Sequence, residues 1–178
     1  EYRPREAVLA QPDLVRQAVG LIRQARRPLA VAGDAAGYAR SGEALQRFVE
    51  TTRVPVLTEG QARGLISDDH PQAFGFFESS LNWAARKLGD ADLVLLLGRK
   101  QDYSIGFCRP PNVAAGAKII QIDPSPAEIG RNRGVAVGMV GDVNSVLEQM
   151  TQEAATHTWQ EQPWLEELRA ARAAQAEW

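Results

Sequence analysis

Residues 91 to 99, Ala91-Asp92-Leu93-Val94-Leu95-Leu96-Leu97-Gly98-Arg99, contain the strongest strand signal in the chain. A short, unbroken apolar run of this kind is typical of a strand that is buried on both faces of a parallel sheet. The glycine that follows favours a change of direction into a loop. We therefore expect this strand in the middle of a parallel sheet, with its carboxyl end opening at Gly98 and Arg99.

Similar segments recur on both sides of this strand, and helical patterns separate them. Further strands are expected at 29–32, 54–58, 118–123 and 135–140, and helices at about 11–26, 36–52, 79–88 and 142–155, with Ser41 as a candidate cap. Parallel neighbours need crossover connections, which helices supply. The alternation predicts an α/β fold: a doubly wound parallel sheet of five to six strands with helices on both faces, Rossmann-like, as in NAD- and FAD-binding domains.

The length of 178 residues and the 44% hydrophobic content suit one domain of this type. We expect a linker at residues 1–10, the nucleotide-binding-like domain at 11–155, and a linker with a helix at 156–178 that leads toward a further, carboxyl-terminal domain. The chain begins with Glu1, which suggests a piece of a larger protein. The tail tryptophans either dock on that further domain or cover the outside of this one: Trp159, Trp164 and Trp178.

Composition excludes several classes of partner and site. A formal net charge of −2 gives no field that would hold the chain on nucleic acid or an anionic membrane. No apolar stretch approaches the roughly 20 residues that span a bilayer. A single cysteine, Cys108, excludes an internal disulfide and a cysteine-based zinc cluster, and is consistent with a reducing cytoplasm. The expected partners are small molecules or other protein surfaces.

Ligands of open parallel sheets gather outside the carboxyl ends of the strands. The residues expected there, and therefore our candidate cofactor-binding residues, are Gly33, Asp34, Gly98, Arg99, Asp123, Gly141 and Asp142, with Gly60 nearby. In a nucleotide cleft the glycines would allow close approach of phosphates, Arg99 would pair with a phosphate, and Asp123 would accept hydrogen bonds from ribose hydroxyls.

A purely structural interpretation of these residues stays open. Glycines end strands in every α/β fold, Asp123 and Asp142 would simply cap helices, and Arg99 would pair with Asp102 or Glu78. Ala35 stands where the second glycine of a dinucleotide fingerprint would be, and no phosphate-loop lysine motif is present, which disfavours an ordinary dehydrogenase or P-loop kinase.

No catalytic residue and no metal ligand is assigned from the sequence. His70 next to Pro71 suits a loop-capping role better than that of a general base, and Asp68-Asp69 suits an exposed turn better than a metal site. Cys108 has no nucleophile signature around it.

Several blocks, read in order, resemble the central domain of thiamine-diphosphate-dependent enzymes related to acetolactate synthase and the 2-oxo acid decarboxylases. The blocks are 28–33 with 41–45, 54–58 with Gly64 and Asp69-His70-Pro71, 91–98, 118–123 with Pro126-Ala127-Glu128-Ile129-Gly130-Arg131-Asn132, and Val140-Gly141-Asp142. The resemblance covers residues 10 to 155, and Ile122 to Asn132 is its most diagnostic part.

The resemblance implies a three-domain enzyme whose flanking domains carry the catalysis. In such enzymes the amino-terminal domain supplies a glutamate that activates thiamine diphosphate, and the carboxyl-terminal domain supplies the motif that binds magnesium and diphosphate, a Gly-Asp-Gly followed by asparagines. The Gly-Asp-Gly motif is absent from this sequence. The chain is therefore expected to be inactive alone, and its partners are expected to be the flanking catalytic domains of a homodimeric or homotetrameric parent.

In this family the central domain binds FAD in acetolactate synthase, binds an adenine nucleotide in oxalyl-CoA decarboxylase, and is empty in several decarboxylases. Gly98-Arg99 and Asp123 match positions that approach the dinucleotide in FAD-binding members. The segment Gly75-Phe76-Phe77-Glu78-Ser79-Ser80 departs from the glycine- and histidine-containing segment of those members, and its Glu78 and two phenylalanines would change the charge and the shape of a flavin cleft. FAD and ADP are both candidates for this domain. One alternative function is a free-standing nucleotide-binding or regulatory module of the same fold, and another is an enzyme that works alone with Asp123, His70 and Arg99.

Overall fold

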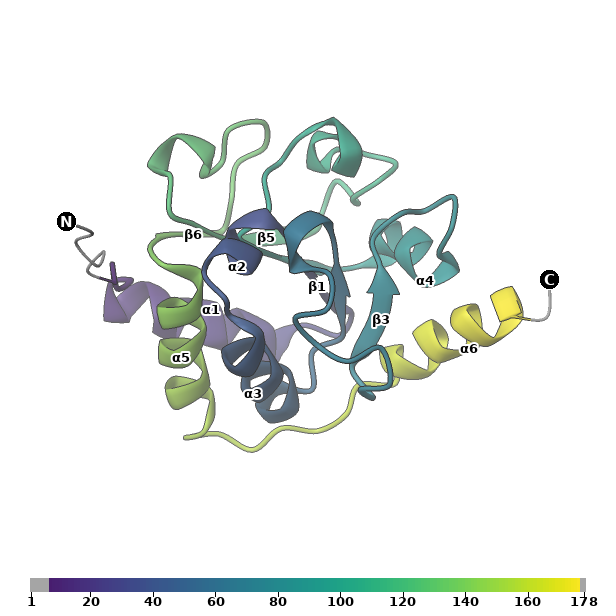
Figure 1. The fold of residues 1–178 in the computed structure, drawn as a ribbon, viewed down its shortest axis with the longest axis horizontal. Helices are drawn as coiled ribbons and strands as arrows, with labels where there is room; N and C mark the ends of the chain where they lie inside the picture. Colours follow the sequence, from purple (N-terminus) through teal and green to yellow (C-terminus); the bar gives the residue numbers. More distant parts are fainter. Residues whose placement is uncertain (1–6, 177–178) are drawn as a thin grey trace.

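A computed structural model describes residues 7–176 and contains a six-stranded, all-parallel sheet (Figure 1). The strand order is β3-β2-β1-β4-β5-β6. The strands are β1 (Pro28–Ala32), β2 (Val56–Thr58), β3 (Ala73–Phe76), β4 (Leu93–Leu97), β5 (Lys118–Asp123) and β6 (Val137–Val140). The expected doubly wound α/β fold is confirmed, and β4 lies in the middle of the sheet, paired with β1 and β5.

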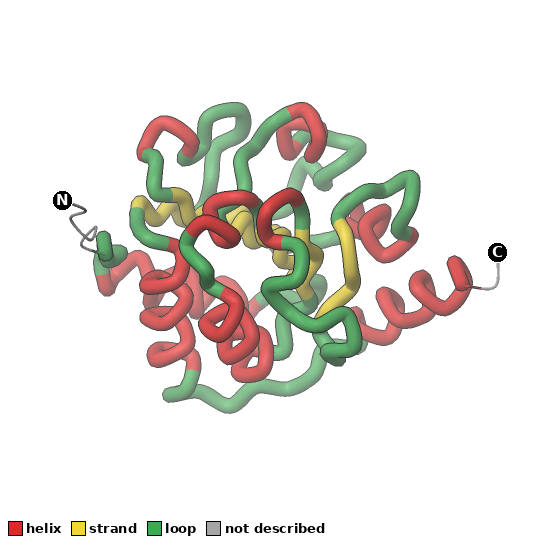
Figure 2. The backbone as a smooth tube through the Cα atoms, viewed as in Figure 1, coloured by secondary structure: helices red, strands yellow, loops and turns green. Residues whose placement is uncertain are grey.

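Helices cover both faces of the sheet (Figure 2). The α-helices are α1 (Pro12–Gln24), α2 (Asp34–Tyr38), α3 (Gly42–Thr52), α4 (Trp83–Arg86), α5 (Val143–Ala154) and α6 (Trp164–Ala176). Short 3-10 helices are η1 (Gly60–Ala62), η2 (Lys87–Asp90), η3 (Tyr103–Cys108) and η4 (Pro126–Glu128). None of the helices within residues 7–176 has the length and apolarity needed to cross a bilayer.

Two hydrophobic clusters share the central strand, because successive side chains of a strand point to opposite faces. Leu95 belongs to the cluster with α1, α3 and α5, and Leu96 belongs to the cluster with α4 and α6. Both side chains are completely buried. This two-sided burial explains why β4 is apolar without alternation.

The strand β3 was not expected from the sequence. It is a four-residue edge strand interrupted by Gly75, whose φ of +80° accompanies a register shift against β2. So short a run with a glycine inside gives neither length nor alternation to recognise. The expected strand at 54–58 begins only at Val56, because Pro55 has no N–H to donate to the ladder.

The expected helix at 36–52 is wrong as a single element. It is divided into α2 and α3 by Arg40, whose φ is +52°. Ser41 occupies the position before α3, but its hydroxyl donates to the carbonyl of Ala36 and makes no capping bond. The expected helix at 79–88 begins only with α4, after the Asn82 side chain accepts from the N–H of Ala84, and it continues as the 3-10 helix η2.

The tail beyond residue 155 packs on this domain through α6. Trp164 is buried, its indole Nε1 donates to the carbonyl of Pro28 at 3.1 Å, and Arg27 lies over its ring. Trp164 thus covers the sheet, and Trp159 donates to the carbonyl of Ala154. Trp178 lies outside the described residues. That residues 156–178 lead toward another domain stays a prediction.

Candidate functional site

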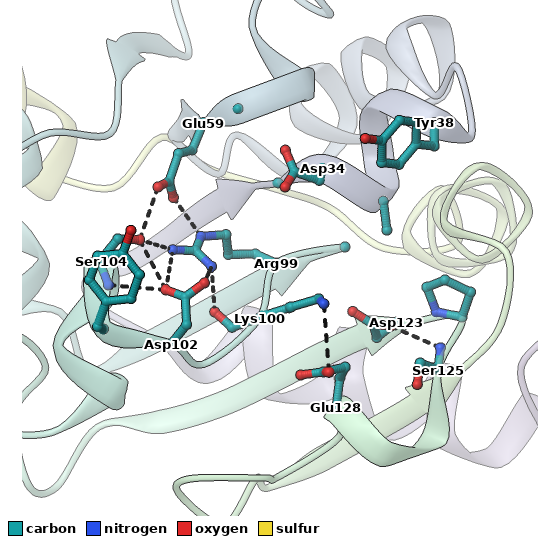
Figure 3. Close-up of a pocket in the computed structure, with 16 residues that line it drawn as sticks. Asp34, Tyr38, Glu59, Arg99, Lys100, Asp102, Ser104, Asp123, Ser125 and Glu128 are labelled. Carbon is teal, nitrogen blue, oxygen red and sulfur yellow. Dashed lines mark hydrogen bonds and ion pairs between the residues drawn. The ribbon is translucent and has the colours of Figure 1, made fainter.

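A cavity of about 630 Å³ opens at the carboxyl ends of β1, β2, β4 and β5 (Figure 3). Ligand pockets of proteins commonly fall between roughly 300 and 1,000 Å³. The residues that line the cavity are Gly33, Asp34, Ala35, Tyr38, Glu59, Gly60, Gly98, Arg99, Lys100, Asp102, Tyr103, Ser104, Asp123, Pro124, Ser125 and Glu128. The cavity therefore has the size and place of a small-molecule site in an α/β fold.

Two glycines allow the loops after β1 and β4 to pass each other at the base of the cavity. Gly98 has a φ of +64°, and a Cβ atom there would come within 2.5 Å of the backbone nitrogen of Ala36. A Cβ on Gly33 would lie 2.8 Å from the carbonyl oxygen of Gly98. Any larger residue at either position would force the two loops apart.

Arg99 is buried and bonded to protein on every side of its guanidinium group. Its Nε donates to Glu59 Oε2 at 2.5 Å, and Nη1 and Nη2 form a bidentate pair with Asp102 at 2.9 Å each. The same group also donates to the carbonyl of Lys100 and to the hydroxyl of Ser104. Arg99 thus ties the loop after β2 to the loop after β4, and the expected pairing with Asp102 is present.

The charges of this cluster support one another. Burial by itself would lower the pKa of Arg99, but the hydrogen bond to Asp102 and the charge of Glu59 raise that pKa above its ordinary value. Burial would likewise raise the pKa of Asp102, but the hydrogen bond and charge of Arg99 hold it below the ordinary value. Both groups therefore stay charged at neutral pH.

The opposite wall of the cavity carries Lys100, Asp123 and Glu128 (Figure 3). The Lys100 amine lies 3.6 Å from Glu128 Oε1, and most of its side chain is exposed. Asp123 Oδ1 accepts from the N–H of Ser125 at 2.8 Å. Burial raises the pKa of Asp123 above its ordinary value, and the neighbouring Glu128 adds to this.

Five of the seven candidate residues line the cavity: Gly33, Asp34, Gly98, Arg99 and Asp123. Gly141 and Asp142 do not line it. A Cβ on Gly141 would meet Val146 and the carbonyl of Val8, and Asp142 caps α5 by accepting from the N–H of Ser145. The structural interpretation of Asp142 is therefore the one that the geometry favours.

Other cavity residues were not expected from the sequence. Glu59, Tyr38, Asp102 and Ser104 lie in loops or short helices, and of these four only Glu59 directly follows the last residue of a recognised strand pattern. A signal was available for Glu59, which follows the strand ending at Thr58. Phe76, Phe77 and Glu78 do not line the cavity, although the family resemblance places them at a flavin cleft.

The remaining candidates lie apart from the cavity. His70 Nδ1 accepts from the N–H of Gln72, as a loop cap would. Burial raises the pKa of the Cys108 thiol to about 11, so it is protonated at neutral pH. Within residues 7–176 no group of three or more His, Cys, Asp or Glu side chains could hold a metal ion, so the described residues do not fit a magnesium site.

Known proteins resemble this chain in sequence. Residues 15–150 match the family model described as thiamine pyrophosphate enzyme, central domain. The chain is 34% identical over 158 residues to oxalyl-CoA decarboxylase of Escherichia coli (strain K12), covering 88% of this chain and 26% of that protein. It is 33% identical over 154 residues to the "probable acetolactate synthase large subunit" of Methanococcus aeolicus, covering 85% and 25%. The chain thus spans about a quarter of the length of these relatives.

The fold also has counterparts among solved structures. Benzoylformate decarboxylase from Polynucleobacter necessarius superimposes with a TM-score of 0.67 at 18% identity, covering 85% of this chain and 29% of that one. At this identity the likeness concerns the fold alone.

Proposed function

This chain belongs to the thiamine pyrophosphate enzyme family, whose central domain it matches, and from that premise we propose that it is the non-catalytic central domain of a decarboxylase or carboligase. The observation that carries the proposal is the match over residues 15–150 in a chain that spans only about a quarter of its relatives. The flanking catalytic domains would belong to the same polypeptide. The parent would be a cytoplasmic homodimer or homotetramer that acts on a 2-oxo acid or an acyl-CoA.

In the parent enzyme the flanking domains would hold thiamine diphosphate and magnesium, and the cofactor would supply the nucleophilic chemistry for reaction at a substrate carbonyl. The described residues offer no side-chain group suited to that metal. What this chain's residues would do is hold a nucleotide and keep the loops at the sheet edge in place.

The cavity suits an adenine nucleotide, either ADP or the adenosine diphosphate part of FAD. Asp123, which is buried at the edge of the cavity, would accept hydrogen bonds from ribose hydroxyls, as acidic residues do in dinucleotide-binding folds. Lys100, rather than Arg99, would meet the phosphates, because all the donor groups of Arg99 are bonded to protein and the Lys100 amine is exposed. Glu128 would release Lys100 when a phosphate binds.

The charge of the cavity favours a second candidate, a purely structural spacer between catalytic neighbours. Its lining includes five carboxylates and two cations, one of which is Arg99. The excess negative charge opposes an anionic ligand unless Lys100 and the loop N–H groups compensate for it. A nucleotide titration separates the two candidates.

We would titrate ADP and FAD into the 178-residue chain and measure the heat of binding. Replacing Lys100 with Met should weaken ADP binding about tenfold or more, as expected for one hydrogen bond to a charged group. The matched control is Arg131→Met, because Arg131 also pairs with Glu128 but does not line the cavity. Absence of heat at millimolar ligand would favour the spacer.

A separate assay tests the lack of catalysis. The chain with thiamine diphosphate, magnesium and pyruvate should release no more carbon dioxide than a boiled control. Turnover above that control would show that the chain carries an active site. The length of the open reading frame would distinguish a central domain from a free-standing module, because the proposal needs roughly 150 residues or more on each side.

A further inference from the structure

Two glutamine side chains are buried where apolar residues would be expected. Gln121 stands in β5 between Ile120 and Ile122 and is completely buried. Gln101, in the loop after β4, is 1% exposed. Burying an amide is unfavourable unless its hydrogen bonds are satisfied, so the partners of these two side chains indicate what they do.

Gln121 holds a turn of the loop that follows its own strand. Its Oε1 accepts from the N–H of Gly130 at 2.9 Å, and its Nε2 donates to the carbonyl of Glu128 at 2.9 Å. Its Nε2 also reaches the carbonyl of Arg99 at 3.4 Å. One side chain therefore connects the loop after β5 to the loop after β4.

Gln101 holds the next part of the same loop. Its Oε1 accepts from the N–H groups of Asn132 and Arg133 at 3.2 and 2.7 Å. Its own carbonyl accepts from the Asn132 side chain at 2.6 Å. The two glutamines touch each other, with Gln101 Nε2 3.3 Å from Gln121 Oε1. Together they fix three loop N–H groups through side-chain acceptors.

The loop they hold is a wall of the cavity, to which it contributes Pro124, Ser125 and Glu128. Resting on the nucleotide-binding function proposed above, we propose that Gln101 and Gln121 are positioning residues, which set the affinity of the cavity by holding residues 124–133 in place. Neither glutamine lines the cavity itself. Their effect on a ligand is therefore transmitted through the loop backbone and through Glu128, which faces Lys100.

Methionine replacements test this with little change in side-chain volume. In Gln121→Met the N–H of Gly130 loses its acceptor, and in Gln101→Met the N–H groups of Asn132 and Arg133 lose theirs. Residue-resolved amide exchange should therefore accelerate at Gly130 in the first variant and at Asn132 and Arg133 in the second. An overall loss of stability would accelerate amides throughout the sheet, so this local pattern is specific to positioning.

The chain offers a matched control in Gln72. This residue is also 1% exposed, but its Oε1 is the one buried side-chain acceptor within residues 7–176 that lacks a partner, and it does not line the cavity. Gln72→Met should leave the exchange of the loop N–H groups unchanged. If it accelerates them as much as the other two variants do, the proposed positioning role is wrong.

The second measurement is the affinity of each variant for ADP. Gln121→Met and Gln101→Met should each weaken ADP binding about tenfold, the equivalent of one lost hydrogen bond, and Gln72→Met should not. If the unaltered chain binds no ADP, the proposed nucleotide binding fails, while the exchange pattern still decides whether the glutamines hold the loop. If the loop N–H groups are released and ADP binds as before, the positioning role in binding is refuted. If Gln121→Met does not fold, the amide-exchange and the ADP-binding measurements are both made on Gln101→Met.

Discussion

Replacing Arg99 with Met separates an anchoring role from a phosphate-binding role. The substitution removes the guanidinium group that bonds Glu59, Asp102 and Ser104, and it keeps an apolar side chain of similar reach. Removing one partner of a buried ion pair costs about 3–5 kcal/mol when the remaining charge is inaccessible to water. Here the Glu59 and Asp102 side chains remain 21% and 40% exposed. We therefore expect a loss of about 2–3 kcal/mol, in the range of hydrogen bonds to charged groups.

The assay is urea unfolding at pH 7, followed by the fluorescence of the tryptophans. Arg131→Met is the control, because the Arg131 side chain is 62% exposed and its pair with Glu128 should contribute less than about 1 kcal/mol. Adding Glu59→Gln to Arg99→Met should recover part of the loss, since the orphaned carboxylate is then neutral. Equal urea midpoints of unfolding for the two arginine variants would refute the anchoring role. A large loss of ADP binding in Arg99→Met without a loss of stability would instead support the phosphate-binding role.

Four further outcomes can be measured on the same chain. Truncating the fully buried Leu95 to Ala should lower the free energy of unfolding by about 2–5 kcal/mol, and unchanged thermal stability would contradict its central position. The pKa of Asp102 is lower in the folded chain than its ordinary value of 3.8, so its contribution to stability is present above that pH and is lost as the pH falls below it. In Asp102→Asn, the free energy of unfolding should therefore fall less steeply as the pH is lowered through this range. Asp142→Ala should cost about 0.5–2 kcal/mol through the lost cap of α5, and helix content by circular dichroism would fall with it. Cys108 is buried and its pKa is raised to about 11, so iodoacetamide at pH 8 should modify it slowly unless urea is added.

The fold could be predicted from the sequence where burial on both faces leaves an unambiguous pattern. The apolar run of β4 is an example, since every one of its side chains enters one of the two cores. The edge strand β3 could not be recognised, because it is paired on one side only and Gly75 interrupts it. Its place depends on pairing with β2, which is a long-range property that no local pattern carries.

The site could be predicted only in part, because residue type does not reveal which partners a side chain finds. Arg99 and Lys100 are adjacent cations after the same strand, and the sequence favoured Arg99 as the phosphate ligand. In the fold Arg99 points toward Glu59 and Asp102, while Lys100 lies on the opposite wall beside Glu128 (Figure 3). Glu59 belongs to a loop 40 residues away in sequence. That distant carboxylate makes Arg99 an anchor, and Lys100 remains exposed.

The strand order explains why the candidate residues divide as they do. From β1 the chain proceeds outward to β3 on one side, and from β4 it proceeds outward to β6 on the other, so the loops after β1 and β4 diverge and leave a crevice. Gly33 and Arg99 follow these two strands, and Asp123 follows the neighbouring β5. Gly141 follows β6, two strands from β4 at the edge of the sheet, where its loop packs on Val8 instead. A sequence can nominate the residues that follow strands, but the choice among them depends on which strand ends are neighbours, and that is decided by the pairing of distant segments.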